Sequence, residues 1–315
     1  MSEYIANRAA VATPAGCRLE RDFCALFLST MNRSTLLAAT ADLSVSCFDH
    51  PPHEVHQDPD VEVAEHWSVA FVQQGRFSLQ CQATSVDLSA GSILLTQPGL
   101  RFSCAHGTEC PDDVCLAVRF EPEAMFGMEG AWDRLGWTAR ARPTPRLALV
   151  HRRLALATAQ RDAFEVERWA LASLEALQAE AMRMGARGSY AVRPGDLDAV
   201  IAASRNMELT PTHKLSVAER ARSVGMTSTQ LTHAFARYLG VSPHQYVVRW
   251  RLNAAAALLN ERCSVSESCY RAGFENLSHF CRSFSRQLGV RASHWHALTV
   301  PERRRKVQAM LAGRS

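Results

Sequence analysis

The chain has 315 residues, of which 47% are hydrophobic, a length and content that suit two globular domains rather than a disordered or fibrous protein. It carries 35 Lys and Arg against 31 Asp and Glu, a formal net charge of +4. The sequence has no apolar run of about 18 residues, and Met1–Arg8 lacks the apolar core of a signal peptide, so we expect a cytoplasmic protein with no membrane partner and reduced cysteines.

The charge is unevenly distributed. Residues 196–315 contain 17 Lys and Arg and 8 Asp and Glu, a charge of +9. Residues 1–195 contain 18 and 23, a charge of −5. An acidic part joined to a basic part is typical of a nucleic-acid-binding domain attached to a domain with another task.

The first 44 residues show no sustained pattern. A short helix is expected between Arg18 and Leu28, and residues 36–43 are small and apolar. We interpret residues 1–44 as an N-terminal arm or lead-in.

From Val45 the apolar residues recur at every second position, which predicts β-strands. Turn signals separate them, among them Gly75, Ala90-Gly91 and Pro98-Gly99. The predicted strands cover residues 44–48, 67–72, 77–81, 86–89, 93–95, 102–104 and 114–120. Short strands at this even spacing predict a sandwich or barrel over residues 45–144.

The same region is rich in cysteine and histidine. Cys104, His106, Cys110 and Cys115 form its densest group, and such side chains suit zinc, copper or a redox sensor. Their spacing matches no Cys-x-x-Cys zinc site, and strand alternation sends some of them to opposite faces. We therefore interpret them as structural thiols and expect no metal, no cofactor and no catalytic residue.

Two helices are predicted after Pro145. Apolar stripes at helical spacing run from Leu147 to Leu154 and from Phe164 to Met184. Glycine and proline then break the pattern, which predicts a linker over residues 185–196. The region 145–184 is thus a helical pair that either caps the β domain or exposes an apolar face for dimerisation.

One pattern occurs twice between residues 197 and 298. Val217–Met226 and Val265–Phe274 each combine a short apolar stripe with a turn glycine. Thr227 or Ser228 caps the helix that follows the first copy, and Asn276 caps the helix that follows the second. These are two helix-turn-helix motifs. Between them, residues 243–259 form a helix of about 25 Å, long enough to hold two recognition helices about 34 Å apart.

The polar faces of the two second helices are candidates for DNA contact. Core residues recur every four positions, as Leu231, Phe235 and Leu239 do, which leaves the other faces outward. The candidates for phosphate contact are Ser228, Arg237, Arg249, Arg251 and Arg286. Residues 299–315 follow as a basic tail.

Residues 198–296 resemble the DNA-binding domain of the AraC/XylS family of bacterial transcription regulators. The motifs that carry the resemblance are Leu239–Tyr246, Arg249–Leu252, Tyr270–Phe274, Ser278–Phe284 and Leu288–Val290. One departure is Arg291-Ala292-Ser293, where the family usually places Ser-Pro before the last helix. Without that proline the chain lacks a residue whose fixed φ favours the first turn of the helix, but the helix itself is still expected.

The resemblance implies which side chains face the bases. These are Thr229, Thr232 and His233 in the first copy, and Leu277, Ser278, His279 and Arg282 in the second. Arg282 is the strongest candidate, because an arginine can bond guanine O6 and N7 together. The first helix offers no arginine or glutamine at these positions, so weaker or thymine-methyl readout is expected there.

The resemblance also implies the whole architecture. We expect an α+β protein: an N-terminal cupin-like β-barrel with a helical pair, then an all-α DNA-binding domain with two helix-turn-helix motifs. The implied function is a transcription regulator, more specifically an activator, whose N-terminal domain senses a small-molecule effector. The implied partners are double-stranded promoter DNA, RNA polymerase, the effector and a second copy of the chain, since the equivalent helical pair commonly forms a dimer interface in the family.

The alternative is an enzyme that carries the same DNA-binding module. A cupin-type metalloenzyme would need a His-x-His pair with a later Glu and His, which His53-Glu-Val-His56 does not supply. A thiol alkyl-acceptor repair protein would need a zinc-held cysteine, which the spacing does not provide. A metal assay and a turnover assay separate these classes from a regulator.

Overall fold

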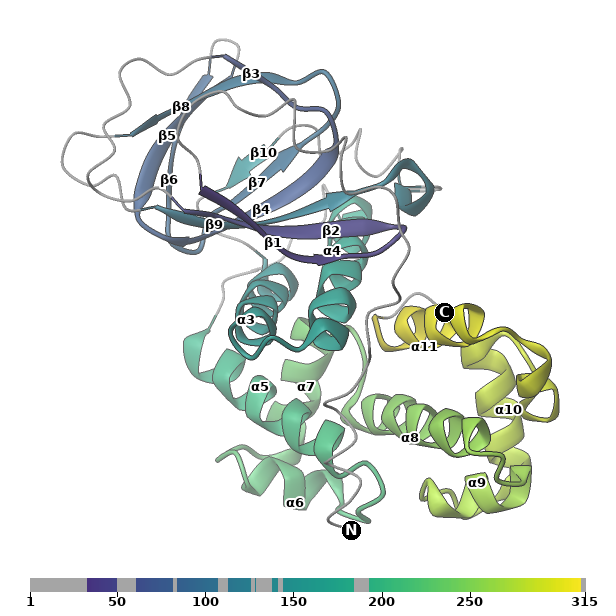
Figure 1. Ribbon diagram of the computed structural model, residues 1–315. Coiled ribbons are helices and arrows are strands. Elements are labelled where there is room, and N and C mark those ends of the chain that lie inside the picture. The colour runs from purple at the N-terminus through teal and green to yellow at the C-terminus, as the bar shows by residue number, and fades with distance from the viewer. Residues whose placement is uncertain are drawn as a thin grey trace. The chain divides into compact units, whose positions relative to one another are not determined.

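The computed structural model describes residues 33–49, 61–81, 84–106, 113–125, 128, 138–140, 144–183 and 193–312. Residues 33–315 form one compact unit. Its N-terminal part is built of strands, and its C-terminal part is helical (Figure 1). The predicted helix between Arg18 and Leu28 lies outside the described residues.

The strands form two antiparallel sheets. The six-stranded sheet has the order β1(Arg33–Ala39), β2(Leu43–Asp49), β9(Val114–Phe120), β4(Trp67–Gln74), β7(Ile93–Thr96), β10(Thr138–Arg140). The four-stranded sheet has the order β3(Glu62–Val63), β8(Arg101–His106), β5(Arg76–Cys81), β6(Thr84–Ser89). In the described ranges, the strand pairings thus give a two-sheet domain and do not close a barrel.

Each face of the six-stranded sheet covers a different core. Cys115 of β9 and Val72 of β4 pack with Leu79 of the four-stranded sheet. Val118 and Phe71, at the alternate positions, belong to the core that also contains the helices of residues 145–183. Because both faces are covered, β9 reads as an almost continuous apolar run rather than a clean alternation.

Three strands were not predicted from the sequence. The expected lead-in of residues 1–44 includes β1, which pairs antiparallel with β2. Most side chains of β1 are exposed, Leu36 to 62%, so the strand lacks the alternation by which burial marks a strand. β3 has two residues and β10 has three, too few to show any period.

The predicted helical pair is α3(Pro145–Ala159) and α4(Ala163–Arg183). Leu147 and Leu154 of α3 and Leu174 of α4 are fully buried and belong to the core shared with the six-stranded sheet. Figure 1 shows α3 and α4 beneath strands of this sheet. His151 stacks on Phe71 of β4 with ring centroids 5.2 Å apart, and burial lowers the pKa of this histidine to about 4. His151 therefore stays neutral at physiological pH and acts as an apolar packing group.

The C-terminal part contains seven helices among the residues that the structure describes. They are α5(Pro194–Leu209), α6(Val217–Arg222), α7(Ser228–Tyr238), α8(Pro243–Asn260), α9(Val265–Arg271), α10(Leu277–Leu288) and α11(Val300–Ala312), with the 3-10 turn η2(Ala292–Ala297) before the last. The helix that begins within Arg291-Ala292-Ser293 is thus the 3-10 turn η2, and its N-cap residue Arg291 makes no side-chain cap hydrogen bond. No helix in the described ranges is both long and apolar enough to cross a bilayer.

Residues 299–315, expected to be a basic tail, include α11. Val307, Met310 and Leu311 of this helix are buried, and Gln308 donates to the Phe164 carbonyl of α4 at 3.3 Å. The charge run Arg303–Lys306 obscured this apolar stripe in the sequence. Thr299 caps the helix by accepting from the Glu302 amide at 3.4 Å.

Candidate nucleic-acid interface

Local signals fix the start of α7, the first recognition helix. Gly225 has φ = 70°, a left-handed conformation that ends α6. Thr227 is the N-cap, and its hydroxyl accepts from the Gln230 amide at 3.3 Å while Gln230 Oε1 accepts from the Thr227 amide at 2.9 Å. This capping box, which resolves the choice between Thr227 and Ser228, satisfies two otherwise open backbone donors.

The second recognition helix, α10, begins in the same way. Asn276 accepts from the His279 amide at 2.9 Å. Gly273 has φ = 87°, and a Cβ there would lie 3.1 Å from the Cα of Thr212, so the turn needs glycine for both backbone conformation and space. The predicted turn glycines and caps of both motifs are therefore confirmed.

Aromatic packing sets the rotation of α10. Phe280 and Phe284 are fully buried, with ring centroids 5.5 Å apart. Phe274 packs on Phe280 at 5.1 Å, and Trp295 packs edge-on against Phe284 at 5.4 Å. Trp295 also donates to Asn260 of α8 at 3.0 Å, which ties the motif to the spacer helix. With this face committed to the core, the opposite face of α10 must point outward.

The structure leaves the predicted base-facing residues accessible to different extents. Ser278, His279 and Arg282 are exposed, and Leu277 is half-buried. In α7, Thr229 and His233 are exposed, whereas Thr232 is half-buried and its hydroxyl donates to the Ser228 carbonyl at 2.8 Å.

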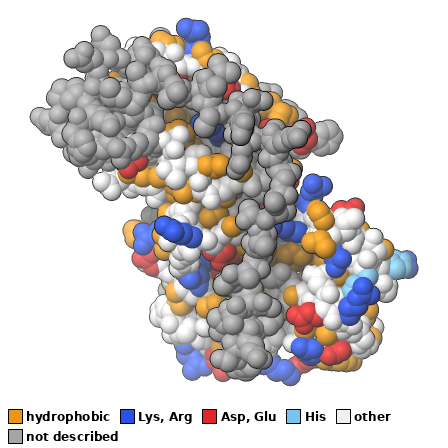
Figure 2. Space-filling model, viewed as in Figure 1, with side chains coloured by type: hydrophobic (Ala, Val, Ile, Leu, Met, Phe, Trp, Pro, Cys, Tyr) orange, Lys and Arg blue, Asp and Glu red, His pale blue; other side chains and the backbone are white. Residues whose placement is uncertain are grey.

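The faces of α7 and α10 carry a favourable charge for DNA. Neither helix contains an acidic residue, and α10 adds Arg282 and Arg286 to the polar surface. Figure 2 shows Lys, Arg and His side chains over the region where Figure 1 draws α10. That these residues contact DNA bases or phosphates remains a prediction.

The five candidates for phosphate contact differ in their surroundings. Ser228 and Arg286 are exposed, and Arg237 is half-buried. Arg251 donates to the Pro211 carbonyl at 2.8 Å and lies against Gly273, so it joins the loop after α5 to the turn of the second motif. Arg251 thus has a structural role that its flanking position beside Trp250 did not indicate.

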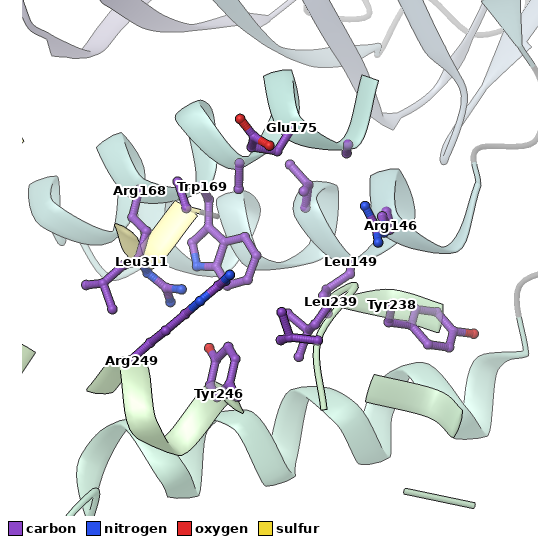
Figure 3. Close-up of a pocket in the computed structure, with 15 residues that line it drawn as sticks. Arg146, Leu149, Arg168, Trp169, Glu175, Tyr238, Leu239, Tyr246, Arg249 and Leu311 are labelled. Atoms are coloured by element: carbon purple, nitrogen blue, oxygen red, sulfur yellow. The ribbon is translucent and has the colours of Figure 1, made fainter. Parts of the chain in front are cut away.

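Arg249 lies in a cleft between α8 and the helical pair. Arg146, Trp169 and Glu175 of α3 and α4 line this cleft with Tyr246 of α8, and Figure 3 shows Arg249 reaching from α8 toward Trp169. Burial lowers the pKa of the Arg249 guanidinium, while the charge of Glu175 acts in the opposite direction. A phosphate contact by Arg249 would require this side chain to leave the cleft.

The cleft itself is small. Its free volume is about 50 Å³, whereas sites for small molecules occupy roughly 300–1,000 Å³. It is therefore no site for an effector of ordinary size. The Arg146 guanidinium fills one end of it so closely that a Cβ at Gly240 would overlap it.

A buried charge cluster accompanies this cleft, and the sequence reasoning missed it. Arg153 of α3 donates to both carboxylate oxygens of Glu208 in α5 at 2.9 and 2.7 Å. Arg168 of α4 donates to Glu165 at 2.6 Å and to Glu208 at 3.2 Å, and the Tyr246 hydroxyl donates to Glu208. We call Arg153, Glu165, Arg168, Glu208 and Tyr246 the interhelix cluster.

Aromatic rings complete the surroundings of the interhelix cluster. Both guanidinium groups lie over Trp169, at 4.8 Å for Arg153 and 4.3 Å for Arg168, and Arg168 also lies 5.2 Å from the ring centroid of Trp250. Two cations and two carboxylates thus balance in a largely buried site. The sequence contained one sign of this cluster, because α3 and α4 each place an arginine at a position of the helical repeat that faces the core. Periodicity alone does not show which residues such an arginine pairs with.

The cysteine and histidine candidates form no metal site in the described part of the chain. Burial raises the pKa of the Cys104 thiol, and it raises that of Cys115 to about 12. Both are therefore protonated, unreactive thiols in the core between the sheets. Cys110 and the side chain of His106 lie outside the described residues.

Comparisons with known proteins match the C-terminal part. A helix-turn-helix domain family matches residues 220–297. The chain is 36% identical over 78 residues to the probable transcriptional regulator LumQ of Photobacterium leiognathi and 28% identical over 83 residues to the uncharacterized HTH-type transcriptional regulator YdiP of Escherichia coli (strain K12). These alignments cover 24% and 26% of this chain but only 32% and 27% of the two relatives.

Two solved structures show likenesses of different extent. A probable AraC family transcriptional regulator from Rhodopseudomonas palustris CGA009 is 27% identical, covers 31% of this chain and 94% of that chain, and has a TM-score of 0.30. ToxT from Vibrio cholerae strain SCE256, crystallised with an unsaturated fatty acid, is 12% identical, covers 83% of this chain and 97% of that chain, and has a TM-score of 0.30.

Two capped recognition helices on one spacer helix, each with its core face packed and its polar face outward, define a double helix-turn-helix DNA-binding domain. The sequence matches in the same region identify it as a helix-turn-helix domain similar to those of bacterial transcription regulators.

Arg286 provides a test of phosphate contact. Arg286→Ala is expected to weaken binding to every DNA sequence about equally and to lower the slope of log affinity against log salt by about one unit, because one neutralised phosphate is lost. Fluorescence anisotropy at several salt concentrations measures both quantities. Arg152→Ala, at an exposed position of α3, is the control, and an unchanged slope for the Arg286 variant removes Arg286 from the contact set.

Proposed function

We propose that the chain is an effector-responsive transcription regulator whose C-terminal domain binds promoter DNA in two successive major grooves. The observation that carries this proposal is the pair of exposed, acid-free faces on α7 and α10. The predicted base contacts are Thr229, Thr232 and His233 from α7, and Leu277, Ser278, His279 and Arg282 from α10. Phosphate contacts by Ser228, Arg237 and Arg286 set the register but carry no sequence information.

The two-sheet domain is the proposed effector domain. In a cupin-like domain a small molecule would bind between the sheets, where Val72, Leu79 and Leu88 form an apolar core. The chain then acts as an activator by recruiting RNA polymerase. A promoter-binding regulator works where the chromosome is, which agrees with the expected cytoplasmic location.

Dimerisation through α3 and α4 has less support than the sequence suggested. Their apolar stripes pack on the six-stranded sheet, and Arg153 and Arg168 engage α5. A homodimer therefore needs another surface or separation of the interhelix cluster. Monomer and dimer masses from light scattering, with and without promoter DNA, distinguish these cases.

Footprinting tests the proposed DNA-binding mode. On promoter DNA near the chain's own gene, we expect two protected segments whose centres lie about 10 base pairs apart on one face of the duplex. The reason is that α8 joins the two motifs as a single rod, so both recognition helices engage together. A single protected segment would contradict the two-groove arrangement, and protection at no sequence would contradict the proposed function.

A further inference from the structure

We propose that the effector carries an oxyanion and that Arg119 of β9, on the inner face of the six-stranded sheet, binds it. This inference rests on the proposed effector-sensing function of the two-sheet domain and adds the chemical class of the ligand. Its basis is a polar row that crosses four neighbouring strands inside an otherwise apolar domain.

The row is defined by strand register. Arg119 lies opposite Ser44 of β2 on one side and opposite Ser68 of β4 on the other. Ser68 in turn lies opposite Thr96 of β7, and the two hydroxyl oxygens are 2.7 Å apart. One cation and three hydroxyl groups thus stand side by side on one face of the sheet.

The neighbouring row shows that this face points toward the four-stranded sheet. One position along each of the same four strands, the register pairs a second row, which consists of Val45, Val118, Val69 and Leu95. These residues are buried in the core that the sheet shares with the helices. Side chains alternate between the two faces of a strand, so the polar row must lie on the opposite, inner face. The inner face also carries Val72, Leu94 and Cys115, which pack with residues of the other sheet.

The Arg119 side chain extends along this inner face. Its guanidinium carbon lies 5.4 Å from the centroid of the Phe48 ring, although Phe48 is four positions beyond Ser44 on β2. The positions in between are the small residues Ser46 and Ala117, which face each other in register. Small side chains there leave a path for Arg119, and Phe48 belongs to the apolar core between the sheets. The guanidinium group therefore lies over the Phe48 ring, displaced along the strands from the row of hydroxyl-bearing residues.

The charge of Arg119 has no counter-ion in the described ranges of the chain. Its half-buried side chain makes a cation–π contact there, but no ion pair with a carboxylate joins it. An arginine with reduced access to water and no anion is unfavourable unless an anion binds it. A guanidinium presents paired donors that match the two oxygens of a carboxylate or the oxygens of a phosphate. Because the side chains between the sheets are apolar, the rest of such a ligand should be apolar as well.

The test uses the full-length protein and four probes of one chain length: hexanoate, hexyl phosphate, hexanamide and hexan-1-ol. Thermal unfolding should show that at least one of the two anions raises Tm and that the two neutral compounds raise it less, since only an anion pairs with Arg119. The better of hexanoate and hexyl phosphate identifies the oxyanion. Arg119→Met should abolish the anion-specific rise and leave the Tm of the ligand-free protein unchanged or higher, because an unpaired charge is removed.

Arg76→Met is the matched control, because Arg76 is an exposed arginine in a strand of the other sheet and should leave the anion response intact. A lower ligand-free Tm for the Arg119 variant would mean that this charge is paired within the protein, and it overturns the proposal. Equal anion responses in both proteins, or none in the wild type, also overturn it. Promoter footprints of the same proteins report separately on the proposed DNA-binding function.

Discussion

Arg282→Ala is expected to lower affinity for the specific DNA site by about tenfold to a hundredfold while non-specific affinity falls much less. Arg282 is exposed on α10, two positions from each of the buried residues Phe280 and Phe284, so the core fixes its direction. Its Nε donates to the Ser278 carbonyl one turn earlier at 3.3 Å, which restrains the side chain along the helix. A bidentate arginine–guanine pair contributes roughly 1–3 kcal/mol of discrimination against a wrong base.

Anisotropy titrations of specific and scrambled duplexes at one salt concentration measure this effect. Arg286→Ala is the matched control, because it removes the same charge from the same helix at a position expected to face phosphate. Equal losses on both duplexes would show that Arg282 also contacts only phosphate. If neither affinity changes, the face of α10 that meets DNA has been assigned incorrectly.

Glu208→Ala should destabilise the protein by about 3–5 kcal/mol, because it leaves the guanidinium groups of Arg153 and Arg168 buried with one carboxylate between them. The two arginine side chains are only 4% and 2% exposed, so water cannot replace the lost anion. The Tyr246 hydroxyl loses its acceptor as well. Chemical denaturation followed by circular dichroism measures the change in the free energy of unfolding.

An exposed ion pair of the same chain provides the control. Lys214 and Glu275 lie 2.8 Å apart with side chains 73% and 77% exposed, so Glu275→Ala should change the free energy of unfolding by no more than about 1 kcal/mol. A similarly small effect of Glu208→Ala would mean that α5 separates readily from the helical pair. In that case the interhelix cluster does not hold the two parts of the chain together.

The interhelix cluster also predicts the direction of a pH effect. Burial by itself would raise the pKa of Glu165, but the charges of Arg168 and Arg153 and the hydrogen bonds from Arg168 and Trp169 outweigh it and lower the pKa. Stabilisation by a carboxylate with a lowered pKa is fully present above the ordinary glutamate range of about 4.3. It is lost as the pH falls through the lowered value, so wild-type stability should drop in acid more steeply than that of Glu165→Gln, which removes this titrating group.

The sequence by itself determined the features whose causes are local. The turn glycines, the caps Thr227 and Asn276 and the four-residue spacing of Phe280 and Phe284 each act within one or two helical turns, so they could be read directly. Because this pattern occurs twice, it indicates a DNA-binding domain far more specifically than a single helix-turn-helix motif would. Apart from β3, the strands of residues 43–120 followed from two-residue alternation and from turn residues for the same reason.

Only the tertiary structure decided what depends on partners distant in the chain. β1 is a strand because β2 pairs with it, and α11 packs although its basic run suggested a solvated tail. Arg249 and Arg251 follow each other closely in sequence, yet one lies in the cleft beside the helical pair and the other bonds the Pro211 carbonyl. The sequence shows the charge of such a residue and the face of the helix on which it lies. Its contribution to stability depends on whether a carboxylate, a carbonyl or water contacts it in the folded protein.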